Sequence, residues 1–184
     1  MRGGLNYACA PFFALTGPAM NAPTTVIRQV TPADLDRCFA IETEAYEGDE
    51  AATREKIATR IETWPQGFIV AEVEGVVAGF INSGAAYQVE MADEAFKEMI
   101  GHDPDGPQVV IMSVVVHPDF QGLGLAKQLM SAFIARMREL GKIRINLMCR
   151  EQHVGLYAGF GFAYLKASAS EHGGLAWHEM ALDL

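Results

Sequence analysis

The sequence predicts an α/β fold in which helices cover both faces of a mixed sheet of about seven strands. Two apolar runs, Gly67 to Val73 and Val76 to Ser83, flank Glu74-Gly75, a pattern that predicts an antiparallel hairpin. Further along, an apolar strand at Val109 to Val116 is followed by a long amphipathic helix and a second strand at Lys142 to Cys149. Because a strand-helix-strand crossover joins parallel strands, the sheet should contain both kinds of pairing.

Local signals place the other elements of the N-terminal half. The residues Thr31-Pro32-Ala33-Asp34 supply a cap, a first-turn proline and a first-turn acid, which together predict the start of a helix. We expect, in order, a strand at Val26 to Val30, a helix from this cap through about Tyr46, a helix from near Thr53 to the residue before Pro65, a short helix at Met91 to Ile100 and a loop at Gly101 to Pro107.

The C-terminal half contains the most regular helical pattern in the chain. Apolar residues recur at three- and four-residue spacing from Leu125 to Leu140, and the predicted helix follows Gly122 and ends at Gly141. After the strand that ends at Cys149 we expect a short helix at Glu151 to Ala158. Two final strands around a turn at Gly173-Gly174 complete the sheet.

The length of the chain indicates one domain. Its 184 residues fall within the size of a single domain, about 100 to 200 residues. We expect this domain at residues 24–184, after a flexible tail at residues 1–23 in which glycine and proline interrupt the apolar residues. The tail makes a poor signal peptide, and Met20 is an alternative start. No apolar stretch approaches the roughly 18 to 20 residues of a membrane span, so we expect a soluble protein. An odd cysteine count without C-x-x-C spacing fits a reducing cytoplasm.

Composition excludes several classes of partner and site. The formal net charge of -9 argues against a nucleic-acid ligand, because such ligands are bound mainly by lysine and arginine, and it is compatible with a small cationic substrate. The three cysteines, Cys9, Cys38 and Cys149, show no C-x-x-C spacing, so neither a disulfide framework nor a zinc site is indicated. Histidines and carboxylates form no persuasive ligand set, and we expect no metal.

The junction between the central strand and the long helix has the features of a phosphate-binding turn. Gly122 and Gly124 lack a Cβ, so the backbone can approach an anion closely. The amide groups of the first helical turn have no partner in the helix and carry a partial positive charge. A P-loop lysine and a G-x-G-x-x-G pattern are both missing here, which argues against a nucleoside triphosphatase or a dinucleotide-binding protein.

Two motifs at this junction and beyond it resemble those of the GNAT superfamily of N-acetyltransferases. The segment Gln121 to Ala126, Q-G-L-G-L-A, is similar to the signature Q/R-x-x-G-x-G/A, and Tyr157 to Phe162 is similar to Y-x-x-F-G-F. Three further segments resemble the arylalkylamine N-acetyltransferase branch: I-E-T-E-A-Y from Ile41, H-D-P-D-G from His102 and H-G-G-L-A-W-H-E-M from His172. The resemblance covers the chain from about Thr25 and implies a GNAT-like, mostly antiparallel sheet.

The resemblance implies where an acetyl-CoA co-substrate would bind. Backbone groups of Val114, Val115 and Val116 would hold the pantetheine arm and polarise the thioester carbonyl. The pyrophosphate would bind at the turn formed by Gln121, Gly122, Leu123, Gly124, Leu125 and Ala126, with Lys127 as an outer charge partner.

The resemblance also suggests catalytic groups. Tyr157 corresponds to the tyrosine that protonates the leaving thiolate, although a core-packing role is the alternative. Vertebrate arylalkylamine enzymes carry two histidines on the central strand, but Val110 and Met112 stand at those positions here. Other branches of the superfamily use a glutamate on the first helix, and Glu44 falls at the corresponding place. The resemblance therefore implies Glu44 as the base, acting through water, with a solvated surface carboxylate as the alternative.

Aromatic and histidine residues are the candidates for the acceptor side. Tyr46 and Trp177 lie in segments that resemble the arylalkylamine branch, and Phe39, Trp64 and Tyr87 are weaker candidates for the same apolar pocket. His102 and His172 are titratable candidates beside loop glycines, with loop hydrogen bonding as their alternative role.

These observations predict acetyl-CoA-dependent acetylation of a small primary amine, an arylalkylamine or a polyamine, by direct attack without an acyl-enzyme intermediate. Acetylation of a protein N-terminus or lysine is one alternative, and a catalytically silent CoA-binding protein is another. Whether the protein forms a homodimer stays open.

Overall fold

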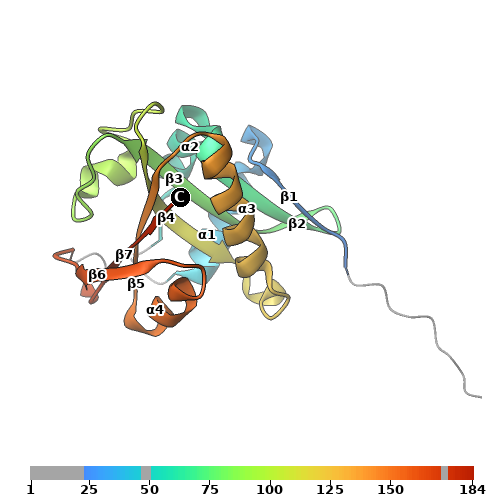
Figure 1. The fold of residues 1–184 in the computed structure, drawn as a ribbon. Coiled ribbons are helices and arrows are strands. Elements are labelled where there is room, and N and C mark those ends of the chain that lie inside the picture. Colours follow the sequence, from blue (N-terminus) through green and yellow to red (C-terminus); the bar gives the residue numbers. More distant parts are fainter. Residues whose placement is uncertain (1–22, 47–50, 171–173) are drawn as a thin grey trace, which may run out of the picture.

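The computed structural model describes residues 23–46, 51–170 and 174–184 (Figure 1). The predicted tail, apart from its last residue, therefore lies outside the described residues, as do His172 and the first glycine of the predicted turn at Gly173-Gly174. None of the helices in the described ranges is long and apolar enough to span a membrane.

The predicted fold class is confirmed: the described chain forms a seven-stranded mixed sheet in the order β1-β2-β3-β4-β5-β7-β6. All neighbouring strands are antiparallel except β4 and β5, which are parallel. The strands are β1 (Thr25–Gln29), β2 (Phe68–Val73), β3 (Val76–Ala86), β4 (Gln108–Val116), β5 (Arg144–Cys149), β6 (Ala163–Ala167) and β7 (His178–Asp183).

Helices pack on both faces of this sheet, as predicted (Figure 1). Helices α1 (Leu35–Ala45) and α2 (Arg54–Thr63) bury apolar residues against Phe68 and Val70 of β2. Helices α3 (Leu125–Glu139) and α4 (Glu151–Ala158) pack on the cluster that contains Ile69 and Ala71. Since consecutive strand residues point to opposite faces, the apolar run in β2 supplies two separate cores.

Two predicted helices differ in detail. The first begins as a 3-10 turn, η1 (Pro32–Asp34), before α1. The short helix predicted at Met91 to Ile100 is only a 3-10 turn, η4 (Glu94–Glu98). Its start is capped by Asp93, and Met99 ends it with a left-handed φ of 63°, so an α-helix cannot continue there. Two other 3-10 turns, η3 (Pro65–Gly67) and η5 (Pro118–Phe120), precede β2 and follow β4.

The sheet opens between its two parallel strands. Residues Gln108 to Val110 of β4 pair with Arg144 to Asn146 of β5, but β4 continues to Val116 and β5 to Cys149 without further pairing between them. On its other edge β4 stays paired with β3, with a register irregularity beside Asn82. The far half of β4 therefore presents backbone groups that have no partner strand on the β5 side.

Candidate active site

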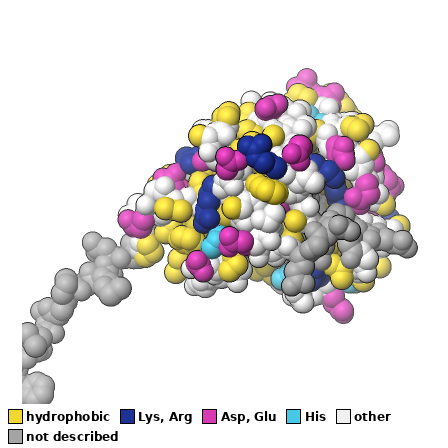
Figure 2. Space-filling model, turned by 180° about the vertical axis from the view of Figure 1, so that it is seen from behind, with side chains coloured by type: hydrophobic (Ala, Val, Ile, Leu, Met, Phe, Trp, Pro, Cys, Tyr) yellow, Lys and Arg dark blue, Asp and Glu magenta, His cyan; other side chains and the backbone are white. Residues whose placement is uncertain are grey.

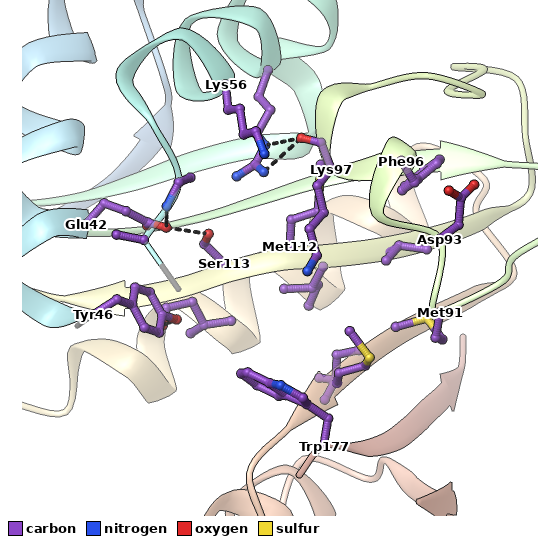
Figure 3. Close-up of a pocket in the computed structure, with 18 of the residues that line it drawn as sticks. Glu42, Tyr46, Lys56, Met91, Asp93, Phe96, Lys97, Met112, Ser113 and Trp177 are labelled. Atoms are coloured by element: carbon purple, nitrogen blue, oxygen red, sulfur yellow. Dashed lines mark hydrogen bonds between the residues drawn. The ribbon is translucent and has the colours of Figure 1, made fainter. Parts of the chain in front are cut away.

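A cavity of about 120 Å³ lies at the opening between β4 and β5. Its wall is built from α1, α2, the segment that contains η4, both parallel strands, α4 and Trp177. Figure 3 shows Glu42 and Tyr46 on one side, Asp93 and Phe96 on the opposite side, and Trp177 approaching from a third. Elements distant in the sequence thus converge on one small space.

Glu42 is the most deeply buried carboxylate in this wall, with 1% of its surface exposed. Its Oε1 accepts hydrogen bonds from the Ala52 amide at 2.9 Å and the Ser113 hydroxyl at 3.2 Å, whereas Oε2 has no partner (Figure 3). Burial raises the pKa of Glu42, and these two bonds together with the charge of Arg60 oppose the rise. A carboxylate in this state is suited to accept a proton.

Glu44, the base expected from the sequence, lies elsewhere. Its carboxylate is 52% exposed and contacts His117 Nε2 at 2.8 Å, and it does not line the cavity. Two residues along a helix correspond to a rotation of about 200°, so Glu42 and Glu44 point in nearly opposite directions. One signal could have identified Glu42: it follows the apolar Cys38 by four residues and therefore lies on the helix face that enters the core.

Tyr157 does line the cavity, from α4. Its ring packs edge-to-face on Phe162, with 5.9 Å between the ring centroids. Burial, and to a smaller extent the nearby Cys149 thiol, raises the pKa of Tyr157 above its ordinary value. The phenol therefore keeps its proton at neutral pH and has one to donate.

Of the acceptor-side candidates, Tyr46 and Trp177 both line the cavity. The Tyr46 hydroxyl also donates to the carbonyl of Val114 at 3.2 Å, which ties the end of α1 to the unpaired part of β4. Phe39 packs instead into the core under α1 and α2, and Tyr87 is exposed.

His102 and Trp64 belong to a separate structural cluster. Nδ1 of His102 accepts from the Ala85 amide at 3.0 Å, and its ring lies 5.3 Å from that of Trp64. The Lys142 ammonium lies over the same Trp64 ring and donates to two carbonyls of the 101–107 loop. Burial lowers the pKa of His102, which stays neutral and anchors this loop to β3 outside the cavity.

The predicted phosphate-binding turn is exposed and open. Gly122 and Gly124 have left-handed φ values of 80° and 74°, and a Cβ at either position would meet no other atom within 4 Å. Glycine is therefore required by backbone conformation rather than by crowding. Gly124 caps α3 without a side-chain hydrogen bond, so the first amides of the helix are available to an anion. These features fit the diphosphate of a CoA thioester.

The neighbouring predicted residues surround this turn. Leu125 is buried and fixes the start of α3 on the core, whereas Leu123 and Lys127 are exposed. The Gln121 side chain donates to the carbonyl of Val116 at 3.4 Å, joining the turn to the end of β4. Ala126 is partly exposed in the first turn of the helix.

Charges of both signs line the cavity. The cations are Lys56, Arg60 and Lys97, and the carboxylates are Glu42, Glu90 and Asp93. On the face shown in Figure 2, lysine and arginine side chains are interspersed with aspartate and glutamate and form no continuous basic surface. Within the described ranges, no three or more histidine, cysteine, aspartate or glutamate side chains are grouped so that they could hold a metal ion.

Comparison with known families and proteins adds independent information. The sequence model of the family described as "Acetyltransferase (GNAT) family" matches residues 35–162. An uncharacterized N-acetyltransferase, ycf52 from Pyropia yezoensis, is 28% identical over 100 residues, which is 52% of this chain and 58% of that protein. The chain spans 22% to 58% of the length of the curated relatives that it matches.

Solved structures share the fold. The loading GNATL domain of CurA from Lyngbya majuscula superposes with a TM-score of 0.76 at 17% identity, over 87% of this chain and 98% of that domain. The Salmonella typhimurium protein yncA, solved with its cofactor acetyl-CoA, superposes with a TM-score of 0.65 at 24% identity, over 89% and 95% of the two chains.

Proposed function

We propose that this chain, which belongs to the acetyltransferase (GNAT) family, transfers an acetyl group from acetyl-CoA to a small primary amine. The amine is an arylalkylamine or a polyamine, and it attacks the thioester directly. Residues 24–184 form the single catalytic domain in this proposal, which the family match and the continuous sheet support.

The donor side rests on the open turn and on the unpaired half of β4. The turn from Gln121 to Ala126, with Lys127 at its outer side, would bind the diphosphate through backbone amides at the start of α3. Val114, Val115 and Val116 would hold the pantetheine arm along the edge of β4 that lacks a partner strand. Both features belong to one continuous segment that leads to the cavity.

Glu42 carries the chemical part of the proposal. Glu42 lines the cavity, its Oε1 is held by two hydrogen bonds, and its buried Oε2 has no hydrogen-bond partner. In this proposal Oε2 is the atom that takes a proton from the ammonium. The amine nitrogen then bonds to the thioester carbonyl carbon, the C–S bond breaks, and the thiolate takes the proton of Tyr157. The newly bonded nitrogen gives up its extra proton, which restores the Tyr157 phenol, so that the products are the neutral amide and the free thiol. This assignment replaces Glu44, which contacts His117 and supports the end of β4.

An acyl-enzyme step finds no support at Cys149, which follows the cavity-lining Met148 at the end of β5. Cys149 is buried, its sulfur lies 3.7 Å from that of Met180, and burial raises its pKa to about 11. It is a neutral thiol near pH 7, and the thiolate is the nucleophilic form. Direct attack by the amine is therefore the simpler route.

The cavity wall favours an amine acceptor with an apolar or a second cationic part. Aromatic surface comes from Tyr46, Phe96 and Trp177, and aromatic faces attract ammonium groups. Glu90 and Asp93 lie in the same wall and could accept a second cationic group. The aromatic faces therefore favour an arylalkylamine, and the two carboxylates favour a polyamine.

The test combines binding with turnover. Calorimetric titration with acetyl-CoA should give saturable binding, and release of free thiol should follow addition of an arylalkylamine or a polyamine. A peptide series with a free N-terminus or a lysine serves as the comparison. Binding without thiol release across all three series would leave only a CoA-binding role, faster turnover of peptides would change the acceptor class, and no binding would end the proposal.

A further inference from the structure

Arg60 is a buried cation that the proposed chemistry does not yet use. It lies on α2 with 3% of its surface exposed, in the wall of the same cavity as Glu42. Its Nε and Nη2 donate to the carbonyl of Lys97 at 3.3 and 2.9 Å, and Nη1 donates to Oδ1 of Asn82 at 3.2 Å. All of these acceptors are neutral, so the hydrogen bonds do not neutralise the charge of Arg60.

The other two cations of the cavity differ in this respect. Lys56 forms an ion pair with Glu98 at 3.3 Å, and Lys97 forms one with Glu94 at 2.9 Å. Among the described residues Arg60 has no acidic partner within ion-pair distance. Moving a charged group from water into the protein interior costs free energy unless an opposite charge compensates it. The burial of a guanidinium without such a partner therefore needs an explanation.

The reason lies along a short chain of contacts that ends at Glu42. Asn82 on β3 is the register partner of Ser113 on β4, and the Ser113 hydroxyl donates to Oε1 of Glu42. Arg60 and Glu42 thus approach the same strand pair from two helices without touching. Each affects the pKa of the other. The charge of Arg60 lowers the pKa of Glu42 against the effect of burial. The charge of Glu42 raises the pKa of Arg60 against burial, which lowers that pKa only to about 10. Arg60 is therefore charged at neutral pH.

We infer that Arg60 is a positioning residue that keeps Glu42 ionised and fixes the η4 segment over the acceptor cavity. The first role follows from an unneutralised charge in a poorly hydrated site, where its field is weakly screened. The second follows from the two hydrogen bonds to Lys97, whose carbonyl is held by α2 (Figure 3). This inference rests on the proposed function, because it assumes that Glu42 is the base.

Other titratable groups face the same cavity and set the controls. They are Tyr46 from α1, Lys56 from α2, Glu90, Asp93 and Lys97 from the segment around η4, and Tyr157 from α4. The two lysines are already paired with glutamates, so their removal should change the titration of Glu42 less than removal of Arg60. Lys56 is the matched control because it lies one helical turn from Arg60 on α2.

The experiment measures kcat/KM against pH for one amine in the wild type and in Arg60→Gln, Arg60→Lys and Lys56→Met. Loss of Arg60 raises the pKa of Glu42, so the acidic limb of Arg60→Gln should move to higher pH by about one unit or more, with recovery at higher pH. Arg60→Lys should keep the limb near its wild-type position, and Lys56→Met should move it less. An unmoved limb in Arg60→Gln overturns the inference.

Asn82→Asp covers the case in which Arg60→Gln does not fold. A carboxylate at residue 82 would pair with Nη1 of Arg60 and neutralise it, so the acidic limb should again move upward; an unmoved limb would contradict the inference. Glu42→Gln separates the two proposals. If Glu42→Gln keeps full activity, the proposed base is wrong. If Glu42→Gln is inactive while Arg60→Gln and Asn82→Asp both keep the acidic limb of the wild-type pH profile, only the role of Arg60 is wrong.

Discussion

The turn after β4 and the cavity beside it are built on different physical bases. The turn begins with four exposed consecutive residues, Gln121 to Gly124, and its proposed binding capacity comes from backbone amides and from two left-handed glycines. The cavity is assembled by side chains from several elements, and its central carboxylate is 1% exposed. Substitutions that alter only a side chain should weaken binding at such a backbone site little, whereas substitutions that alter the backbone conformation should weaken it strongly. The reverse should hold for the cavity.

Glu42→Gln is the most severe test of this contrast. Loss of the proton acceptor should lower kcat by about 10²- to 10⁴-fold while leaving acetyl-CoA binding intact, since the turn is separate from the carboxylate. Steady-state kinetics and calorimetry measure the two quantities. Glu44→Gln is the matched control on the same helix, and its kcat should fall much less. Equal losses in both variants would contradict the assignment.

Tyr157→Phe should have the next largest effect. Without the phenolic proton the thiolate must leave unprotonated or take a proton from water, so kcat should fall about 10- to 100-fold. The ring still packs on Phe162, so the melting temperature should barely change. Thiol-release kinetics and thermal unfolding report the two effects. Unchanged turnover would leave Tyr157 with a packing role alone.

Gly124→Ala probes the backbone site directly. At a φ of 74° an alanine costs about 1 to 2 kcal/mol, and its Cβ would project into the open space over the turn. We expect about tenfold weaker binding of acetyl-CoA with kcat at saturation nearly unchanged. Gly155→Ala on α4 is the control, because that position is also open but has a helical backbone. A larger loss of acetyl-CoA affinity in Gly155→Ala than in Gly124→Ala would contradict a backbone site at the turn.

His102→Gln addresses a third region and should have the smallest effect. Burial lowers the pKa of His102 in the folded state, so between that pKa and the ordinary value near 6.5 the unfolded chain binds more protons. Stability in this window therefore falls as pH falls. The wild type should lose about 2 °C more of melting temperature between pH 7 and 5 than His102→Gln. Identical pH dependence would contradict the neutral anchoring role.

Much of the fold could be read from local patterns, and the departures have local causes. The turn signal at Glu74-Gly75 was sufficient to predict the pairing of β2 with β3. The apolar period from Leu125 was sufficient to predict the longest helix, α3. The helix predicted at Met91 to Ile100 extends too far at its C-terminal end, because Met99 adopts a left-handed conformation that no common sequence rule assigns to methionine. The opening between β4 and β5 has no sequence signal, since both strands remain apolar where their pairing ends.

The sequence by itself determined the order of elements, the family and the open glycine turn before α3, because each depends on short-range backbone preferences or on consecutive residues. Only the tertiary structure decided which glutamate enters the cavity, that His102 anchors a loop, and that Arg60 lines the same cavity as Glu42. These outcomes depend on the direction in which each helix presents its side chains to strands distant in the sequence. Packing of the whole core sets that direction.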